Sequence, residues 1–181
     1  MEAYLLDWAN LLLRWAHIIT GISWIGASFY FVSLDNSLTP PKSKADSDKG
    51  VGGEQWGVHG GGFYHVQKYL SAPGQMPEHL TWFKWEAYLT WVTGFLLLVV
   101  QYYLQPGAYL IDPAILSLAP WQAIAISLVS IALAWIIYDA LCRTLAEKYP
   151  TLLIAAVFAL ILALAHFFGQ VFSGRGAFIH V

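Results

Sequence analysis

The stretch "LLLRWAHIITGISWIGASFYF", from Leu11 to Phe31, decides the fold class of this chain. It is long and apolar enough to cross a lipid bilayer as a helix, which takes about 20 residues. Charged residues make up only 11% of the 181 residues, whereas a soluble domain has about 25%. The sequence therefore predicts an all-α integral membrane protein whose main partner is the lipid bilayer.

Three further apolar stretches have the same character. The predicted transmembrane helices are residues 11–34, 82–104, 121–141 and 151–172, and a long loop, 35–81, joins the first two. We expect a four-helix bundle in a single membrane domain, 1–181. Three glycines between aromatic segments in the loop predict a hairpin or a compact loop. The chain stops after "GQVFSGRGAFIHV" without a polar tail, so we interpret it as truncated.

Lysine and arginine are distributed unevenly around the predicted helices. Seven of the nine lie on the side of the long loop, and only Arg14 and Arg175 lie on the side of the N-terminus. By the positive-inside rule, we expect a multi-pass protein of the bacterial inner membrane, with loop 35–81 in the cytoplasm and the N-terminus in the periplasm.

Two features exclude other classes of site and partner. Cys142 is the only cysteine, which excludes an internal disulfide and a C-x-x-C-H attachment, so a c-type haem is not on this chain. No segment is rich enough in Lys and Arg for phosphate binding, so we expect no nucleic-acid partner.

A polar stripe runs along one face of the first predicted helix. Residues three or four positions apart share a helix face, and here they are Arg14, His17, Gly21, Trp24 and Ser28. The glycine leaves room for a helix or a planar ligand. On the last predicted helix, His166 and Gln170 belong to a comparable stripe, so both faces are predicted to line the bundle interior.

His17 and His166 are predicted to lie at the same depth in the membrane. With a rise of about 1.5 Å per residue, each is about 9 Å from the N-terminal side. Two neutral imidazoles at one level can supply both axial ligands of a b-type haem, or part of a copper or iron site. The alternative is that each histidine hydrogen-bonds to a neighbouring helix and only holds the bundle together.

Arg14 and Arg175 are candidate ligands for negative charge on the N-terminal side. Arg14, one turn before His17, could bind a haem propionate or an anionic substrate, or extend to the lipid headgroups. Arg175 in "SGRGAF" could bind an anion through its guanidinium. A metal site in the long loop has weaker support, because His59 and His65 do not have a strong ligand spacing.

Four stretches carry a family resemblance: "LLDWANLLLRWAHIITGISWIGASFYFVSLDNSLTPP", "GVGGEQWGVHGGGFYHVQKYL", "PEHLTWFKWEAYLTWVTGF" and "FSGRGAFIHV". Together they resemble the membrane domain of the membrane-bound bacterial urate oxidase family, also called urate hydroxylase. The resemblance implies a domain of about eight transmembrane helices, commonly followed by a c-type cytochrome domain. It also implies a role in purine degradation, the oxidation of urate to 5-hydroxyisourate, with electrons passed to a respiratory chain and no hydrogen peroxide made.

The chain departs from that family pattern, because it has four predicted crossings and no C-x-x-C-H. We therefore expect either the N-terminal half of such a protein or a chain that works with a separate remainder and an external electron acceptor. Its first helix also resembles that of membrane protoporphyrinogen oxidases and of copper-resistance membrane proteins. A haem-precursor oxidase, a copper-handling protein and a non-enzymatic anchor or assembly subunit of a redox complex are the alternatives.

The expected activity assigns roles to seven residues, none of them a catalytic residue. Urate would be oxidised near the N-terminal side, and electrons would pass through haem b, or an equivalent metal centre, to a fused or separate c-type cytochrome. His17 and His166 would hold the haem, with Gly21 and Trp24 beside it; Trp24 could also stack on urate. The residues expected to bind urate or a propionate are Arg14, Gln170 and Arg175.

Overall fold

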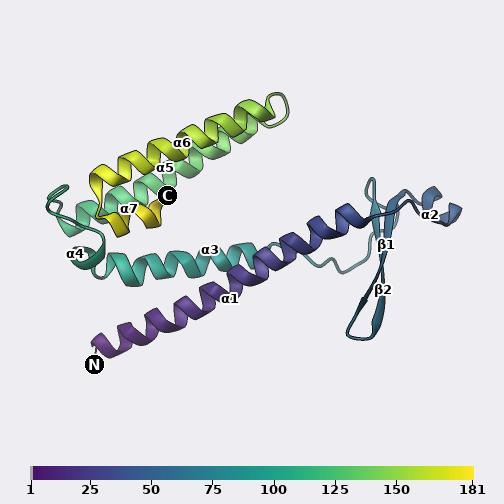
Figure 1. Cartoon of the computed structure of the whole chain (residues 1–181), viewed down its shortest axis with the longest axis horizontal. Helices are drawn as coiled ribbons and strands as arrows, with labels where there is room; N and C mark the ends of the chain where they lie inside the picture. The colour runs from purple at the N-terminus through teal and green to yellow at the C-terminus, as the bar shows by residue number, and fades with distance from the viewer. Residues whose placement is uncertain (1) are drawn as a thin grey trace. The chain divides into compact units, whose positions relative to one another are not determined.

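The computed structural model describes residues 2–181 and consists mainly of helices (Figure 1). It divides into two compact units. The first unit contains the residues up to Arg14 together with Thr93–Val181, and the second is Trp15–Val92. Helices α1 (Glu2–Ser37) and α3 (Trp85–Leu98) each contribute residues to both units.

Within residues 2–181, three helices are long and apolar enough to cross a membrane: α1, α5 (Pro120–Leu145) and α6 (Pro150–Val171). They contain the predicted helices 11–34 and 121–141, and all but the last residue of 151–172. Proline starts both α5 and α6, where its missing N–H has no partner to lose. The apolar stretches of all three are almost entirely unburied within the protein, as lipid-facing helices are.

The expectation of a fourth membrane-spanning helix at 82–104 is not supported, because the candidate spans within residues 2–181 are α1, α5 and α6. The helix starts only at Trp85, and α-helical geometry ends at Leu98, where a π-helix, η1 (Val99–Tyr103), continues the chain. The α-helical part is 14 residues long, about 21 Å, which is shorter than the hydrocarbon core of a bilayer, about 30 Å. The hydropathy of the sequence predicted one helix over the whole apolar stretch, because hydropathy does not distinguish α-helical from π-helical hydrogen bonding.

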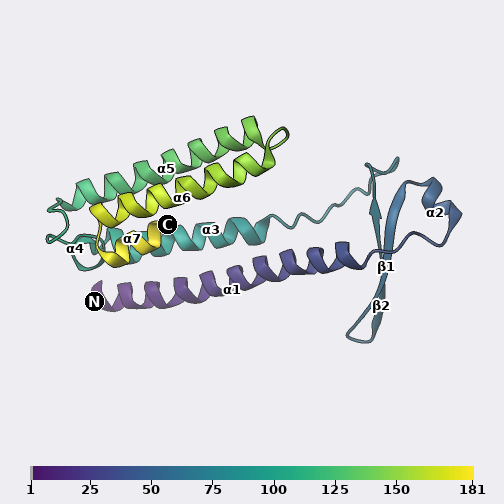
Figure 2. The same cartoon turned by 45° about the horizontal axis from the view of Figure 1, so that its top comes forward.

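The first unit packs around one apolar cluster. Helices α5 and α6 lie side by side (Figure 2), and the short helices α4 (Pro106–Tyr109) and α7 (Gly174–His180) close one end. Ser173 ties them together: its Oγ accepts from Gly176 N at 3.0 Å and donates to Tyr109 O at 2.6 Å. The buried members of the cluster are Leu98, Tyr102, Leu110, Ala123, Phe168, Val171 and Phe172.

The second unit contains the predicted hairpin. Strands β1 (Val51–His59) and β2 (Gly62–Tyr69) are antiparallel, and the short helix α2 (Lys44–Asp48) precedes them. The turn residues Gly60 and Gly61 have φ of +57° and +80°, the left-handed values that a two-residue type I′ turn requires and that glycine adopts without strain. The hairpin prediction is therefore confirmed.

Candidate functional site

The π-helix η1 joins two groups of polar side chains in the first unit. Gln101 Oε1 accepts a hydrogen bond from Arg14 Nη2 at 3.0 Å, and Arg14 Nε donates to Asn10 Oδ1 at 2.5 Å. Two residues after Gln101, the Tyr103 hydroxyl lies 2.6 Å from Ser127 Oγ of α5. Single π-helical turns occur frequently at functional sites, so this segment is the first candidate site.

The second group is a hydrogen-bonded chain with a defined direction. His180 Nδ1 lies 2.6 Å from Gly176 O, and a carbonyl only accepts, so Nδ1 carries the proton and Nε2 of the neutral ring is an acceptor. Ser127 Oγ is hydrogen-bonded to Nε2 and must therefore donate its proton to it. Tyr103 then donates to Ser127, and the chain runs from Tyr103 through Ser127 to His180.

This chain lies in an apolar environment. Ser127 is completely buried, and the His180 ring centroid lies 5.0 Å from that of Phe168 and 4.9 Å from that of Phe172. Helix α7 lies outside the three candidate membrane-spanning helices. Burial lowers the pKa of His180, and the hydrogen bond to Gly176 opposes this change in part. Burial thus favours the neutral imidazole, and in that form Nε2 can accept the hydrogen bond from Ser127.

Sequence reasoning missed all three residues of this chain. Ser127 is one small polar residue in an apolar helix, and His180 is the second-last residue of the chain. Helical periodicity relates residues within one helix, whereas Tyr103, Ser127 and His180 come from three. The only local signal was a histidine next to the apolar "GAFI" of α7.

Three of the residues predicted for haem or urate binding lie on the helices at the C-terminal end of the first unit. The Arg175 guanidinium carbon lies 5.7 Å from the ring centroid of Tyr109, a cation–π distance, and its side chain is exposed. His166 and Gln170 are exposed on α6. Among residues 2–181, no hydrogen bond joins Arg14, Gln170 and Arg175, so their shared role stays a prediction.

His17 lies in the second unit, half-buried beside α3. Its Nδ1 is 3.1 Å from Thr90 O, so Nδ1 carries a proton and Nε2 has the lone pair that a metal ligand needs. Histidines that bind a metal commonly donate their other N–H to a backbone carbonyl. The residue thus fits a haem ligand, and its pairing with His166 of the first unit stays a prediction.

The surroundings of His17 on α1 also fit a planar group. A Cβ on Gly21 would meet no atom within 4 Å, so the space beside the glycine is open. Trp24, one turn further, exposes 46% of its surface. Among residues 2–181, no three His, Cys, Asp or Glu side chains are placed to hold a metal ion together.

Two polar residues of the long loop, Glu54 and His65, are hydrogen-bonded to each other in the hairpin. Glu54 is buried; its Oε2 lies 3.1 Å from His65 Nε2, and its Oε1 accepts from Lys42 N at 3.1 Å. The His65 ring stacks on Trp56 with centroids 4.3 Å apart. These contacts attach the hairpin to the chain that follows α1. They give Glu54 and His65 a structural role in the hairpin.

The comparisons with known proteins identify a family. Residues 3–181 match the family model described as urate oxidase N-terminal. A search of the curated proteins and a search of the solved structures found no match.

Proposed function

The chain belongs to the urate oxidase N-terminal family, and from this premise we propose that it is part of a membrane oxidoreductase that converts urate to 5-hydroxyisourate. The family match over residues 3–181 is the observation that carries the proposal. Three helices that can span a membrane support a membrane location. We place the protein in the bacterial inner membrane with its N-terminus in the periplasm, and we propose a c-type cytochrome, fused or separate, as the electron acceptor.

Arg14 is the residue that we propose to bind urate. Urate is a planar anion at neutral pH, and a guanidinium offers it a positive charge and parallel N–H donors. The hydrogen bonds to Asn10 and Gln101 orient the Arg14 side chain. Since the carbonyl of Gln101 is used by Arg14, its amide N–H groups are left for a urate oxygen. Arg175 and Gln170 are proposed as further ligands of urate or of a haem propionate.

Haem b is the cofactor that we propose for this chain. His17 and His166 are the residues that would hold it, with Gly21 and Trp24 as the neighbouring residues on α1. When bound, the haem would supply one-electron transfer between urate and the acceptor. The hydrogen bond from His17 to Thr90 supports this role, because it fixes the ring and places the proton on Nδ1.

The chain from Tyr103 to His180 is proposed to take up protons. Oxidation of urate by two electrons with addition of water releases two protons. Nε2 of the neutral His180 imidazole is the proton acceptor at the end of this chain, and because burial lowers the pKa of His180, the proton would be held only transiently. The direction of the hydrogen bonds from Tyr103 through Ser127 to His180 supports transfer toward it.

Urate-dependent reduction of added cytochrome c by membranes tests the proposed function. Membranes from a strain that makes the protein should reduce cytochrome c with urate, and those from a deletion strain should not. Arg14→Gln should raise KM for urate about tenfold or more, because an ionic hydrogen bond is lost. The matched control, Arg143→Gln, removes an arginine whose partner is Asp139 on the same helix, and should leave KM unchanged.

Other outcomes of this test would contradict the proposal. Equal activity of the deletion strain would leave the anchor or assembly subunit as the better assignment. Porphyrin accumulation or copper sensitivity on deletion, with no response to urate, would favour haem-precursor oxidation or copper handling.

A further inference from the structure

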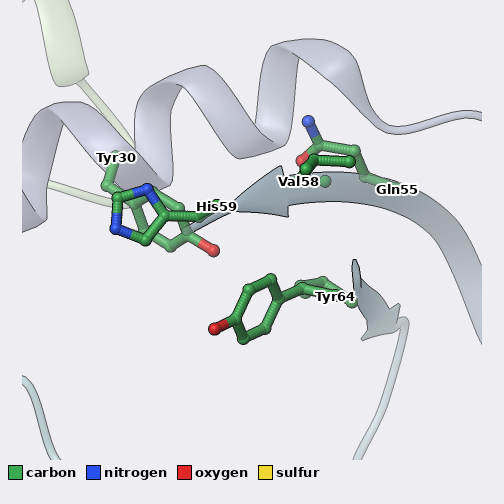
Figure 3. A pocket seen from close by; sticks show the side chains of 7 residues that line it. Tyr30, Gln55, Val58, His59 and Tyr64 are labelled. Carbon is green, nitrogen blue, oxygen red and sulfur yellow. The ribbon is translucent and has the colours of Figure 1, made fainter. Parts of the chain in front are cut away.

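A cavity lies between the hairpin and α1 within the second unit (Figure 3). Its volume is about 480 Å³, within the range of small-molecule sites, about 300–1,000 Å³. The cavity takes residues from three elements, α1, β1 and β2. They are Tyr30, Gln55, Gly57, Val58, His59, Tyr64 and Val66.

The strand register explains why this face of the hairpin is hollow. Gln55, Gly57 and His59 alternate along β1 and therefore share one face, and Gly57 is paired with Tyr64 of β2. Gly57 has no side chain between those of Gln55 and His59, and a Cβ there would meet no atom within 4 Å. The opposite face carries Trp56 and His65, which stack on each other. One face of the hairpin thus lines the cavity, and the other carries the stacked Trp56 and His65 rings.

The polar groups around the cavity are not used by the protein itself. Among the described residues, the side chains of Tyr30, Gln55, His59 and Tyr64 make no hydrogen bond to one another or to the rest of the chain. Two phenols, an imidazole and an amide all offer donors that suit carbonyl oxygens, and three of them are aromatic rings. None of the described residues that line the cavity is a carboxylate, lysine or arginine, so the lining has no permanently charged side chain to offer an anion.

We propose that this cavity binds the ring of a quinone. A quinone is uncharged and planar and has carbonyl oxygens on opposite sides of the ring, which suits donors from different elements. Tyr30 belongs to α1, a candidate membrane-spanning helix, so a ligand dissolved in lipid can reach the cavity from the bilayer. An anion such as urate fits the neutral lining less well.

A redox role for the bound quinone rests on the proposed function. The binding of a quinone in this cavity does not depend on that function. Urate gains the oxygen of a water molecule through a new C–O bond and releases two protons and two electrons. Bound quinone would be an alternative acceptor to the c-type cytochrome: it takes up two electrons and two protons and becomes a quinol. Atoms and charge therefore balance without a further oxidant. The hydroxyls of Tyr30 and Tyr64 would hold the carbonyl oxygens that become protonated.

Binding of ubiquinone-1 to the full chain in detergent tests the inference, measured by isothermal titration in the absence of urate. Gly57→Leu should fill the cavity and weaken binding more than tenfold, and Tyr64→Phe should weaken it about fivefold to tenfold through one lost hydrogen bond. The control Phe63→Leu changes an exposed residue of the opposite strand face and should leave Kd unchanged. Far-UV circular dichroism should show that all variants are folded.

The outcomes separate the inference from the proposed function. Equal Kd values of the parent, Gly57→Leu and Tyr64→Phe chains for ubiquinone-1 would overturn the quinone site. It would also be overturned if the parent chain bound urate and Gly57→Leu abolished urate binding but not ubiquinone-1 binding. Quinone binding that Gly57→Leu weakens supports the site. If membranes then fail to oxidise urate with either cytochrome c or ubiquinone-1, the proposed function fails and the binding site stands.

Discussion

Ser127 donates a hydrogen bond to Nε2 of His180, 53 residues further along the chain. The contact joins α5 to α7 within the apolar cluster of the first unit. Because Ser127 also accepts from Tyr103, one fully buried hydroxyl connects three helices. A buried polar group that satisfies two others stabilises a particular packing arrangement, because any alternative would leave all three unpaired.

Replacing Ser127 by alanine should destabilise the first unit. The change leaves the Tyr103 hydroxyl and His180 Nε2 without their partner, and a buried unsatisfied group costs about 1–3 kcal/mol. Unfolding of the purified protein in detergent should show this loss. The control Ser23→Ala removes a hydroxyl that, among the described residues, donates to Ile19 O of its own helix, and it should have little effect. Equal stability of the two variants would contradict the network.

Stability should depend on pH through His180. Its pKa in the folded chain is below the usual 6.5 because of burial, so the unfolded chain binds a proton first as the pH falls. The stabilisation is complete above pH 6.5 and is lost as the pH falls from 6.5 through the lower, folded pKa. The melting temperature should therefore fall between pH 7.5 and 5, and this fall should be smaller in His180→Gln. The control His79→Gln changes a histidine at an exposed position and should behave like the parent chain. If the melting temperature of His180→Gln fell as much as that of the parent chain, His180 would not be the group responsible.

Loss of the proposed haem ligands should remove haem. The purified protein should show a b-type absorption spectrum, and His17→Ala or His166→Ala should abolish it, because one axial ligand is lost in each. The control His65→Ala changes a histidine that is paired with Glu54 in the hairpin and should keep the spectrum. A parent protein without haem, or a spectrum unchanged in both ligand variants, would show that these histidines are structural.

The turn of the hairpin should require glycine or asparagine. Gly60 has φ of +57°, where an L residue other than Asn or Asp costs about 1–2 kcal/mol. Gly60→Val should therefore open the hairpin, seen as faster hydrogen exchange of the amides of β1 and β2. Gly60→Asn should keep the exchange slow. Fast exchange already in the parent chain would contradict the type I′ turn.

Local features of the sequence were enough for much of the fold. The apolar stretches predicted the membrane class and the positions of α1, α5 and α6, since hydropathy depends on neighbouring residues only. The glycines before Phe63 predicted the hairpin, because few other residues tolerate positive φ. His17 was recognised for a similar reason, as an ionisable residue in an apolar helix is conspicuous in the sequence.

What only the tertiary structure decided involves contacts between distant segments. The second predicted helix is divided into α3 and η1, and two residues of η1 contact distant segments: Gln101 contacts Arg14, and Tyr103 contacts Ser127. The hollow beside Gly57 depends on strand register and on Tyr30 of another element. The sequence alone determined which segments are apolar and where the chain can turn, because both are local properties. The partners of Arg14, Ser127 and His180 depend on how helices far apart in the chain pack, and no local pattern records that.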